Sequence, residues 1–181
     1  MSPTAIYGFL THGIVFGAFV ALLPLGSKRR ILALAAIPVA LVAGIASFMH
    51  GIIGTPSLTL LALAIWQLAG RAPSPLAYRP ALILIAFALP FYAMALGLGP
   101  LDPYVLGYQP LPLLAASIPL AALLWWRRLD CWLLILALDL ACYASGLFSN
   151  LWDALFDPLL VLVALAVVIG QHVRSSVASS G

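Results

Sequence analysis

Charge is what this sequence has least of. Only 7% of its 181 residues are charged, and all five acidic residues are aspartates. An ordinary soluble domain carries roughly 25% charged residues. The eight basic residues are scattered over an apolar chain and form no patch that could follow a nucleic-acid backbone. The scarcity of charge excludes a water-soluble globule, a disordered chain and a nucleic-acid-binding protein.

Several signatures of catalysis are missing as well. The sequence contains no Walker motif, no glycine-rich dinucleotide loop, no His-Glu-x-x-His and no Gly-x-Ser-x-Gly. Its two cysteines, Cys131 and Cys142, are separated by roughly 16 Å of helical rise and cannot bridge each other. Neither belongs to a Cys-x-x-Cys pair, which gives no support for thiol oxidoreductase chemistry. A non-enzymatic role is therefore favoured over an enzymatic one.

Apolar residues are what the sequence has in abundance, at 65% of the chain and a mean hydropathy of +1.16. A helix needs about 20 apolar residues to cross a hydrocarbon core about 30 Å thick. The sequence predicts an all-α integral membrane protein, with residues 1–181 forming a single transmembrane domain. The expected bundle has seven helices, at 5–25, 31–50, 56–70, 80–99, 111–126, 131–149 and 158–173.

The third of these spans is the least certain. Gly51, Gly54 and Pro56 break helix propagation and predict a tight hairpin between the second and third spans. A re-entrant half-helix at 56–70 is the alternative, and it would leave six full spans. Lys and Arg are enriched in cytoplasmic loops, and seven spans place all eight basic residues on one side. We therefore expect an inner-membrane protein with its N-terminus outside and its C-terminus in the cytoplasm.

An internal repeat is visible when the chain is shifted by 102 residues. The shift aligns the second and third spans with the sixth and seventh, and it pairs Gly44 with Gly146 and Pro56 with Pro158. Shared composition is the alternative explanation. A genuine repeat would give three helices, a linker helix at 80–99 and three more helices in the same orientation. Sugar transporters of the SWEET type are similar in this architecture alone, since their halves are parallel repeats.

Asp139 is the acidic residue that the topology does not explain, because it falls near the middle of the sixth span. A charged residue there costs about 2.5–3.5 kcal/mol on insertion scales and usually faces the bundle interior. Cys142 and Tyr143 follow at i+3 and i+4 and share its helix face. The sequence leaves two interpretations open: a proton or cation relay, or a hydrogen bond that holds a neighbouring helix.

Two histidines, His12 and His50, lie on consecutive antiparallel spans, so their depths in the membrane could match. Two neutral imidazoles on adjacent helices could ligate a metal or a b-type haem. A structural hydrogen bond is the favoured interpretation for each histidine. The sequence identifies neither a metal nor a cofactor.

Polar residues also gather at the predicted outer surface. Asp157 is expected to cap the seventh helix, with Pro158 at its first position. The loop that contains Asp102 is the longest on this side and could cover the mouth of a cavity. The candidate outer cluster consists of Ser57, Asp102, Tyr104, Asn150 and Asp153.

Small residues predict where helices pack closely. Gly13 and Gly17 form a Gly-x-x-x-Gly motif in the first span, and Ala36, Ala40 and Gly44 continue this packing pattern in the second. Pro90 and Pro119 lie inside the fourth and fifth spans and are expected to kink them.

Three functions are compatible with these features. The favoured one is a transporter or channel for a small solute or ion, with a midplane cavity near Asp139. The second is a non-catalytic subunit or assembly factor, which would bind haem or quinone through His12 and His50. The third is an outer-leaflet lipid-processing enzyme that uses His50 and aspartates. The expected partners are the lipid bilayer and other membrane subunits or further copies of this chain.

Overall fold

The fold was described from a computed structural model, which covers residues 2–23, 25–71 and 73–179, with side chains up to residue 172. The chain is 78% helical, and the described residues contain no strand. The expectation of an all-α protein is therefore confirmed. The α-helices are α1 (Pro3–Val20), α2 (Arg29–Val42), α3 (Ile45–Ile53), α4 (Leu58–Leu68), α5 (Tyr78–Ala93), α6 (Leu111–Trp126), α7 (Asp130–Ala144), α8 (Leu151–Leu155) and α9 (Pro158–Ser179).

Three short elements complete the chain: η1 (Gly26–Lys28), the π-helical η2 (Met94–Leu98) that extends α5, and η3 (Pro103–Gly107). Each of the seven predicted spans contains a helix, and side-chain caps explain several of the starts. The side chain of Ser2 accepts a hydrogen bond at the start of α1, and that of Ser57 does the same at the start of α4.

The second predicted span is not one continuous helix, so that prediction was wrong. The chain bends by 74° between the segments Gly26–Val42 and Ile45–Ile53. Gly44 adopts φ +79° at the break, a left-handed conformation that glycine tolerates and that ends a helix. A Cβ atom added there would meet nothing within 4 Å. The role of Gly44 is therefore to terminate α2, and its assignment to a packing face was also wrong.

Three helices are long and apolar enough to cross a membrane: Pro3–Val20, Tyr78–Leu98 and Leu151–His172. A fourth is added if the bent pair of α2 and α3 counts as one span. Helix α4 has 11 residues, which rise by about 16 Å and cover about half of a hydrocarbon core. Helix α6 is apolar, but its 16 residues are also too few for it to count among the helices long enough to cross a membrane.

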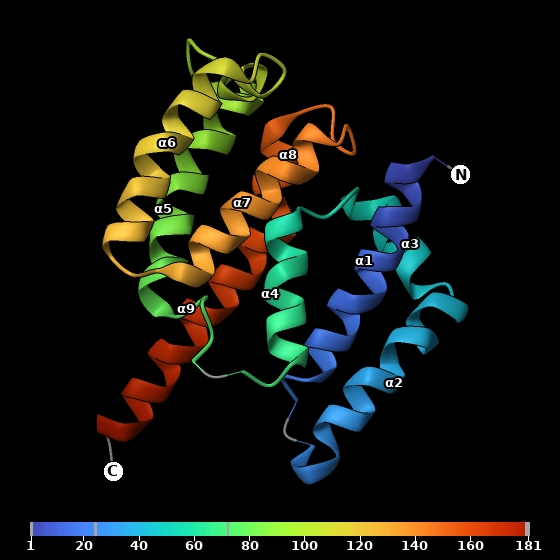
Figure 1. Cartoon of the computed structure of the whole chain (residues 1–181). Helices are drawn as coiled ribbons and strands as arrows, with labels where there is room; N and C mark the ends of the chain where they lie inside the picture. Colours follow the sequence, from blue (N-terminus) through green and yellow to red (C-terminus); the bar gives the residue numbers. More distant parts are fainter. Residues whose placement is uncertain (1, 24, 72, 180–181) are drawn as a thin grey trace.

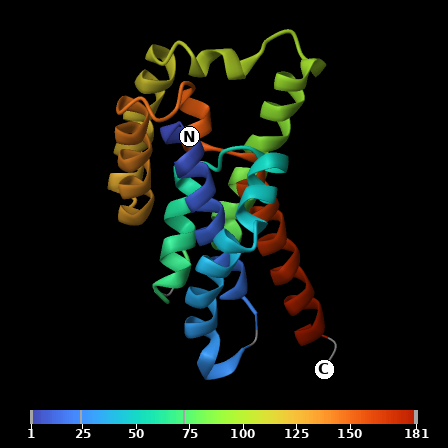
Figure 2. The same cartoon turned by 90° about the vertical axis from the view of Figure 1, so that its right-hand side faces the viewer.

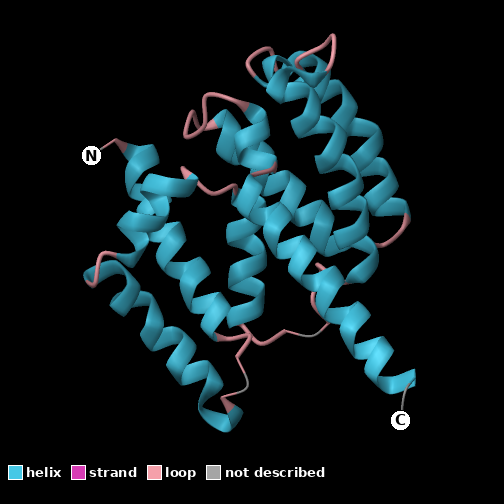
Figure 3. Cartoon of the chain, turned by 180° about the vertical axis from the view of Figure 1, so that it is seen from behind, coloured by secondary structure: helices cyan, strands magenta, loops and turns pink. Residues whose placement is uncertain are grey.

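The long helices alternate in direction (Figure 1). Helix α1 packs against α2, α3 and α4, while α5 packs against α9 and α7 packs against α4. Helix α6 contacts α7 and η3 and has no buried residue. Figure 2 shows the segment around η3 reaching across one end of the molecule from α5 to α6. The view from behind in Figure 3 shows that loops join the helices mainly at the two ends of the molecule.

The predicted close packing of α1 is confirmed at Gly13 and Gly17. A Cβ on Gly13 would lie 2.8 Å from a methyl group of Leu41. A Cβ on Gly17 would lie 2.6 Å from a side-chain carbon of Ile37 and 2.8 Å from the carbonyl oxygen of Ala33. The backbones of α1 and α2 therefore approach each other over a face that has no room for side chains.

A Gly17→Val variant is expected to lower the free energy of unfolding by about 1–3 kcal/mol, because the added carbons force α1 away from α2. The matched control is Gly170→Ala in α9, where a Cβ would meet nothing within 4 Å. That change should be neutral or slightly stabilising, since alanine favours a helix more than glycine does. Unfolding in mixed detergent micelles would measure both, and equal stability of the two variants would contradict the packing argument.

The elements that the 102-residue shift aligns also match in the structure. Helices α2 and α7 end 102 residues apart, at Val42 and Ala144, and α3 and α8 also end 102 residues apart. The two glycines that follow α2 and α7 have nearly the same backbone conformation, with φ +79° at Gly44 and +78° at Gly146. Each half therefore has the order helix, left-handed glycine, shorter helix and helix, although α4 is much shorter than its counterpart α9.

Candidate functional site

Asp139 lies inside the helix bundle and is only 1% exposed. Its Oδ2 atom accepts a 2.7 Å hydrogen bond from the hydroxyl of Thr59, which is buried in the first turn of α4. Its Oδ1 atom is buried and has no hydrogen-bond partner in the described part of the chain. Asp139 thus joins α7 to α4 and still has one unused acceptor. Its two proposed roles, in packing and in a relay, both remain compatible with this geometry.

Tyr7 of α1 brings a third helix to this region. Its hydroxyl is buried, and Thr11, Cys142, Asp139 and Asp157 are all near it. Cys142 therefore lies in the same region as Asp139. Tyr143 is half-buried, and no hydrogen bond within the described ranges links it to Asp139. Sequence reasoning missed Tyr7 and Thr59, because their partners are far away along the chain.

The two histidines are brought together, as predicted. Their ring centroids are 5.8 Å apart, and Nε2 of His12 and Nδ1 of His50 lie 2.9 and 3.1 Å from the same carbonyl oxygen, that of Gly54. Gly54 ends α3, so these bonds fix the connection between α3 and α4 against α1. This geometry favours structural hydrogen bonds for both rings. The described residues contain no group of three or more His, Cys, Asp or Glu side chains that could hold a metal ion.

Asp157 connects the beginnings of two helices. Its Oδ1 accepts from the backbone N–H of Leu160 at 2.9 Å, which confirms the predicted cap of α9. Its Oδ2 accepts from the backbone N–H of Ser57 at 2.8 Å, at the start of α4. The partial positive charges of two helix N-termini thus face one buried carboxylate. The second of these bonds has no signal in the sequence, because Ser57 and Asp157 are 100 residues apart.

The outer cluster forms only in part. The hydroxyl of Tyr104 in η3 donates a 2.7 Å hydrogen bond to Oδ1 of Asp153 in α8, and the amide of Asn150 donates to the carbonyl of Tyr104 at 3.1 Å. Asp102 is exposed, and the hydrogen bond that it accepts within the described residues comes from the backbone N–H of Tyr104. Ser57 is fully buried, so its placement on the surface was wrong; its hydroxyl caps α4.

Burial, together with the hydrogen bond to Asp153, raises the pKa of Tyr104 above the usual value of a tyrosine. Its hydroxyl therefore stays protonated at neutral pH and remains a hydrogen-bond donor. Because Trp152 also donates from its indole Nε1 to the carbonyl of Pro103 at 2.9 Å, η3 is fastened to α8 by several bonds.

A pocket of about 320 Å³ lies beside these bonds, and we call it the α8 pocket. It lies between η3, α8, the end of α5, and the connection between α3 and α4. Asp153 and Asp157 line it together with Thr55 and several apolar side chains. Its aromatic lining consists of Phe91, Tyr92, Tyr104, Trp152 and Phe156.

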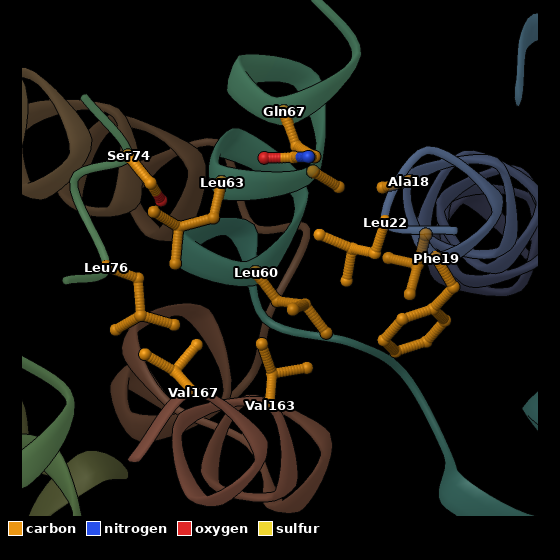
Figure 4. A pocket seen from close by; sticks show the side chains of 12 residues that line it. Ala18, Phe19, Leu22, Leu60, Leu63, Gln67, Ser74, Leu76, Val163 and Val167 are labelled. Atoms are coloured by element: carbon orange, nitrogen blue, oxygen red, sulfur yellow. The ribbon is translucent and has the colours of Figure 1, made fainter. Parts of the chain in front are cut away.

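A second pocket, of about 100 Å³, lies between α1, α4 and α9, near the connection from α4 to α5 (Figure 4). Its wall is apolar except for Gln67 and Ser74, and Val163 and Val167 contribute from α9. We call it the α1–α9 pocket. It is lined by residues near the ends of α1 and α4, whereas the α8 pocket is lined by residues near the end of α5 and the start of α9.

A third pocket, of about 360 Å³, follows α4 and α7 and is mostly apolar, with Trp66 and Arg71 at one end. Asp139 lines none of these three pockets, so the predicted cavity beside it is not among them.

Comparison of the chain with protein families, with curated proteins and with solved structures found no match.

Proposed function

We propose that this chain is a multi-pass inner-membrane protein that carries a small solute or ion across the membrane. In this proposal the chain crosses the bilayer seven times, with residues 56–70 as a short third crossing, the N-terminus outside and the C-terminus in the cytoplasm. The alternating direction of the helices in Figure 1 supports this topology. So does the distribution of Lys and Arg, which fall in the segments that would face the cytoplasm.

The observation that carries the proposal is the position of two pockets along one helix. Helix α9 contributes Asp157 and Pro158, at its start, to the α8 pocket and Val163 and Val167 to the α1–α9 pocket. Between them lie Leu159 and Leu160, which are only 6% and 1% exposed. A layer of buried leucines between two pockets can act as the barrier that a transporter needs between its two sides.

Asp139 has a defined place in this proposal. Its partner Thr59 directly precedes Leu60, which is 3% exposed and lines the α1–α9 pocket. A carboxylate with an unused acceptor at that level is suited to bind a proton or a small cation that is moved with the solute. The matched order of elements in the two halves supports a parallel repeat of three helices on each side of α5.

Flux into proteoliposomes tests the proposal. Vesicles that contain the full chain should admit protons or another small monovalent cation faster than protein-free vesicles do, when a potassium gradient drives entry. A Leu160→Ala variant should increase uncoupled leak several-fold, because it thins the dry layer between the pockets. The matched control is Leu162→Ala, on the same helix at a side chain that is 59% exposed. Equal flux with and without protein, for protons, alkali cations and small ammonium ions, would overturn the proposal.

A further inference from the structure

The α8 pocket has properties that the transport proposal does not use. It combines two carboxylates with a wall of aromatic rings in a space of about 320 Å³. Ligand pockets have volumes of roughly 300–1,000 Å³, which puts this one at the small end. We propose that the α8 pocket binds a small organic cation, a compound whose charged group is a substituted ammonium.

The charges around the pocket favour a cation. Its lining contains Asp153 and Asp157 and no Lys, Arg or His. The negative charge of Asp157 is already stabilised, because its carboxylate accepts backbone N–H bonds at the starts of α4 and α9. Asp153 is half-buried, and its hydrogen bond comes from the neutral hydroxyl of Tyr104. The described side chains form no ion pair with it, so a bound cation would supply the missing counter-charge.

The aromatic side chains favour an organic cation over a metal ion. Phe91 packs edge-on against Trp152 with ring centroids 4.8 Å apart, and Tyr92 stacks on Phe156 at 5.3 Å. Aromatic faces attract substituted ammonium groups, and sites for quaternary ammonium ligands are often built as such cages. A metal ion such as Ca²⁺ would require six to eight oxygen ligands. Both oxygens of Asp157 already accept backbone N–H bonds and one oxygen of Asp153 accepts from Tyr104, which leaves few carboxylate oxygens for a metal ion.

The pocket is also held in shape without a ligand. Tyr104 and Trp152 are fixed by their hydrogen bonds to Asp153 and Pro103. Phe87, behind the pocket, contacts Phe91, Trp152 and Phe156 at 5.7 Å between ring centroids. Because the rings are already packed, binding does not have to order them, which favours affinity.

Calorimetric titration of the detergent-purified full chain with choline chloride tests this inference. We expect binding of choline and little binding of 3,3-dimethylbutan-1-ol, which has nearly the same shape and no charge. Asp153→Asn should weaken choline binding by at least about tenfold, because it removes the charge and keeps an acceptor for Tyr104. Asp102→Asn, at an exposed aspartate nearby, is the matched control and should bind choline as the parent chain does.

Three results would overturn the inference: no heat of choline binding up to about 10 mM, equal binding of the neutral alcohol, or unchanged binding by a correctly folded Asp153→Asn variant. The test is independent of transport. Choline binding without any flux would overturn the proposed function alone, whereas proton flux without choline binding would overturn this inference alone.

Discussion

Proteoliposomes that contain an Asp139→Asn variant are expected to lose cation-coupled flux by at least about tenfold. Asparagine has nearly the shape of aspartate, and its carbonyl oxygen can still accept the hydrogen bond from Thr59. The variant should therefore fold with α7 still joined to α4. It cannot take up and release a proton or balance a bound cation, so only the coupling step is removed.

The matched control for this variant is Asp130→Asn on the same helix. Asp130 lies in the exposed first turn of α7, so the same chemical change there should leave flux unaltered. Gel filtration and thermal unfolding would show that both variants are folded. Unchanged flux in folded Asp139→Asn protein would remove the coupling role and leave Asp139 as a packing residue.

An Asp157→Ala variant is expected to lower the free energy of unfolding by about 3–6 kcal/mol. The estimate follows from two hydrogen bonds to a carboxylate, each contributing about 1.5–3 kcal/mol, whose N–H donors would be left buried. The side chain is only 5% exposed, so water cannot readily replace it. Asp157→Asn should be less harmful, because its carbonyl oxygen can still accept from one of the two N–H groups.

Equilibrium unfolding in mixed detergent micelles would measure this loss. The control is Asp102→Ala, which also removes a carboxylate that accepts from a backbone N–H, but at an exposed position. Its cost should be about 0.5–1 kcal/mol. If the two alanine variants were equally stable, Asp157 would be an ordinary cap and not a link between two helices.

The sequence predicted the helical segments well, because continuous apolar runs and local caps leave few alternatives. The turn around Gly54, the Asp157 cap and the Gly13–Gly17 face are all decided by neighbouring residues. The break at Gly44 was missed because an isolated glycine in an apolar run is tolerated in a helix. Its repeat partner Gly146 gave no better signal, because the sixth predicted span, 131–149, likewise runs through it, whereas α7 ends at Ala144.

The candidate site was less predictable, since its contacts join distant parts of the chain. Nothing local indicates that Asp139 meets Thr59, or that Asp153 meets Tyr104. Likewise, the α8 pocket takes Phe91 and Tyr92 from α5, Asp153 from α8, and Asp157 from the start of α9. Periodicity could place Asp139 on an interior face, but the choice of partner depends on how the helices pack.

The double hydrogen bond at Asp157 also has a mechanical consequence. Because it ties the starts of α4 and α9 together, these two helices can move relative to each other mainly by swinging about that point. Helix α9 has 22 residues, so its far end lies about 30 Å from the pivot. A rotation of about 10° would displace that end by about 5 Å and leave the start in place. The displacement of α9 is thus largest at the end of the helix farthest from the α8 pocket.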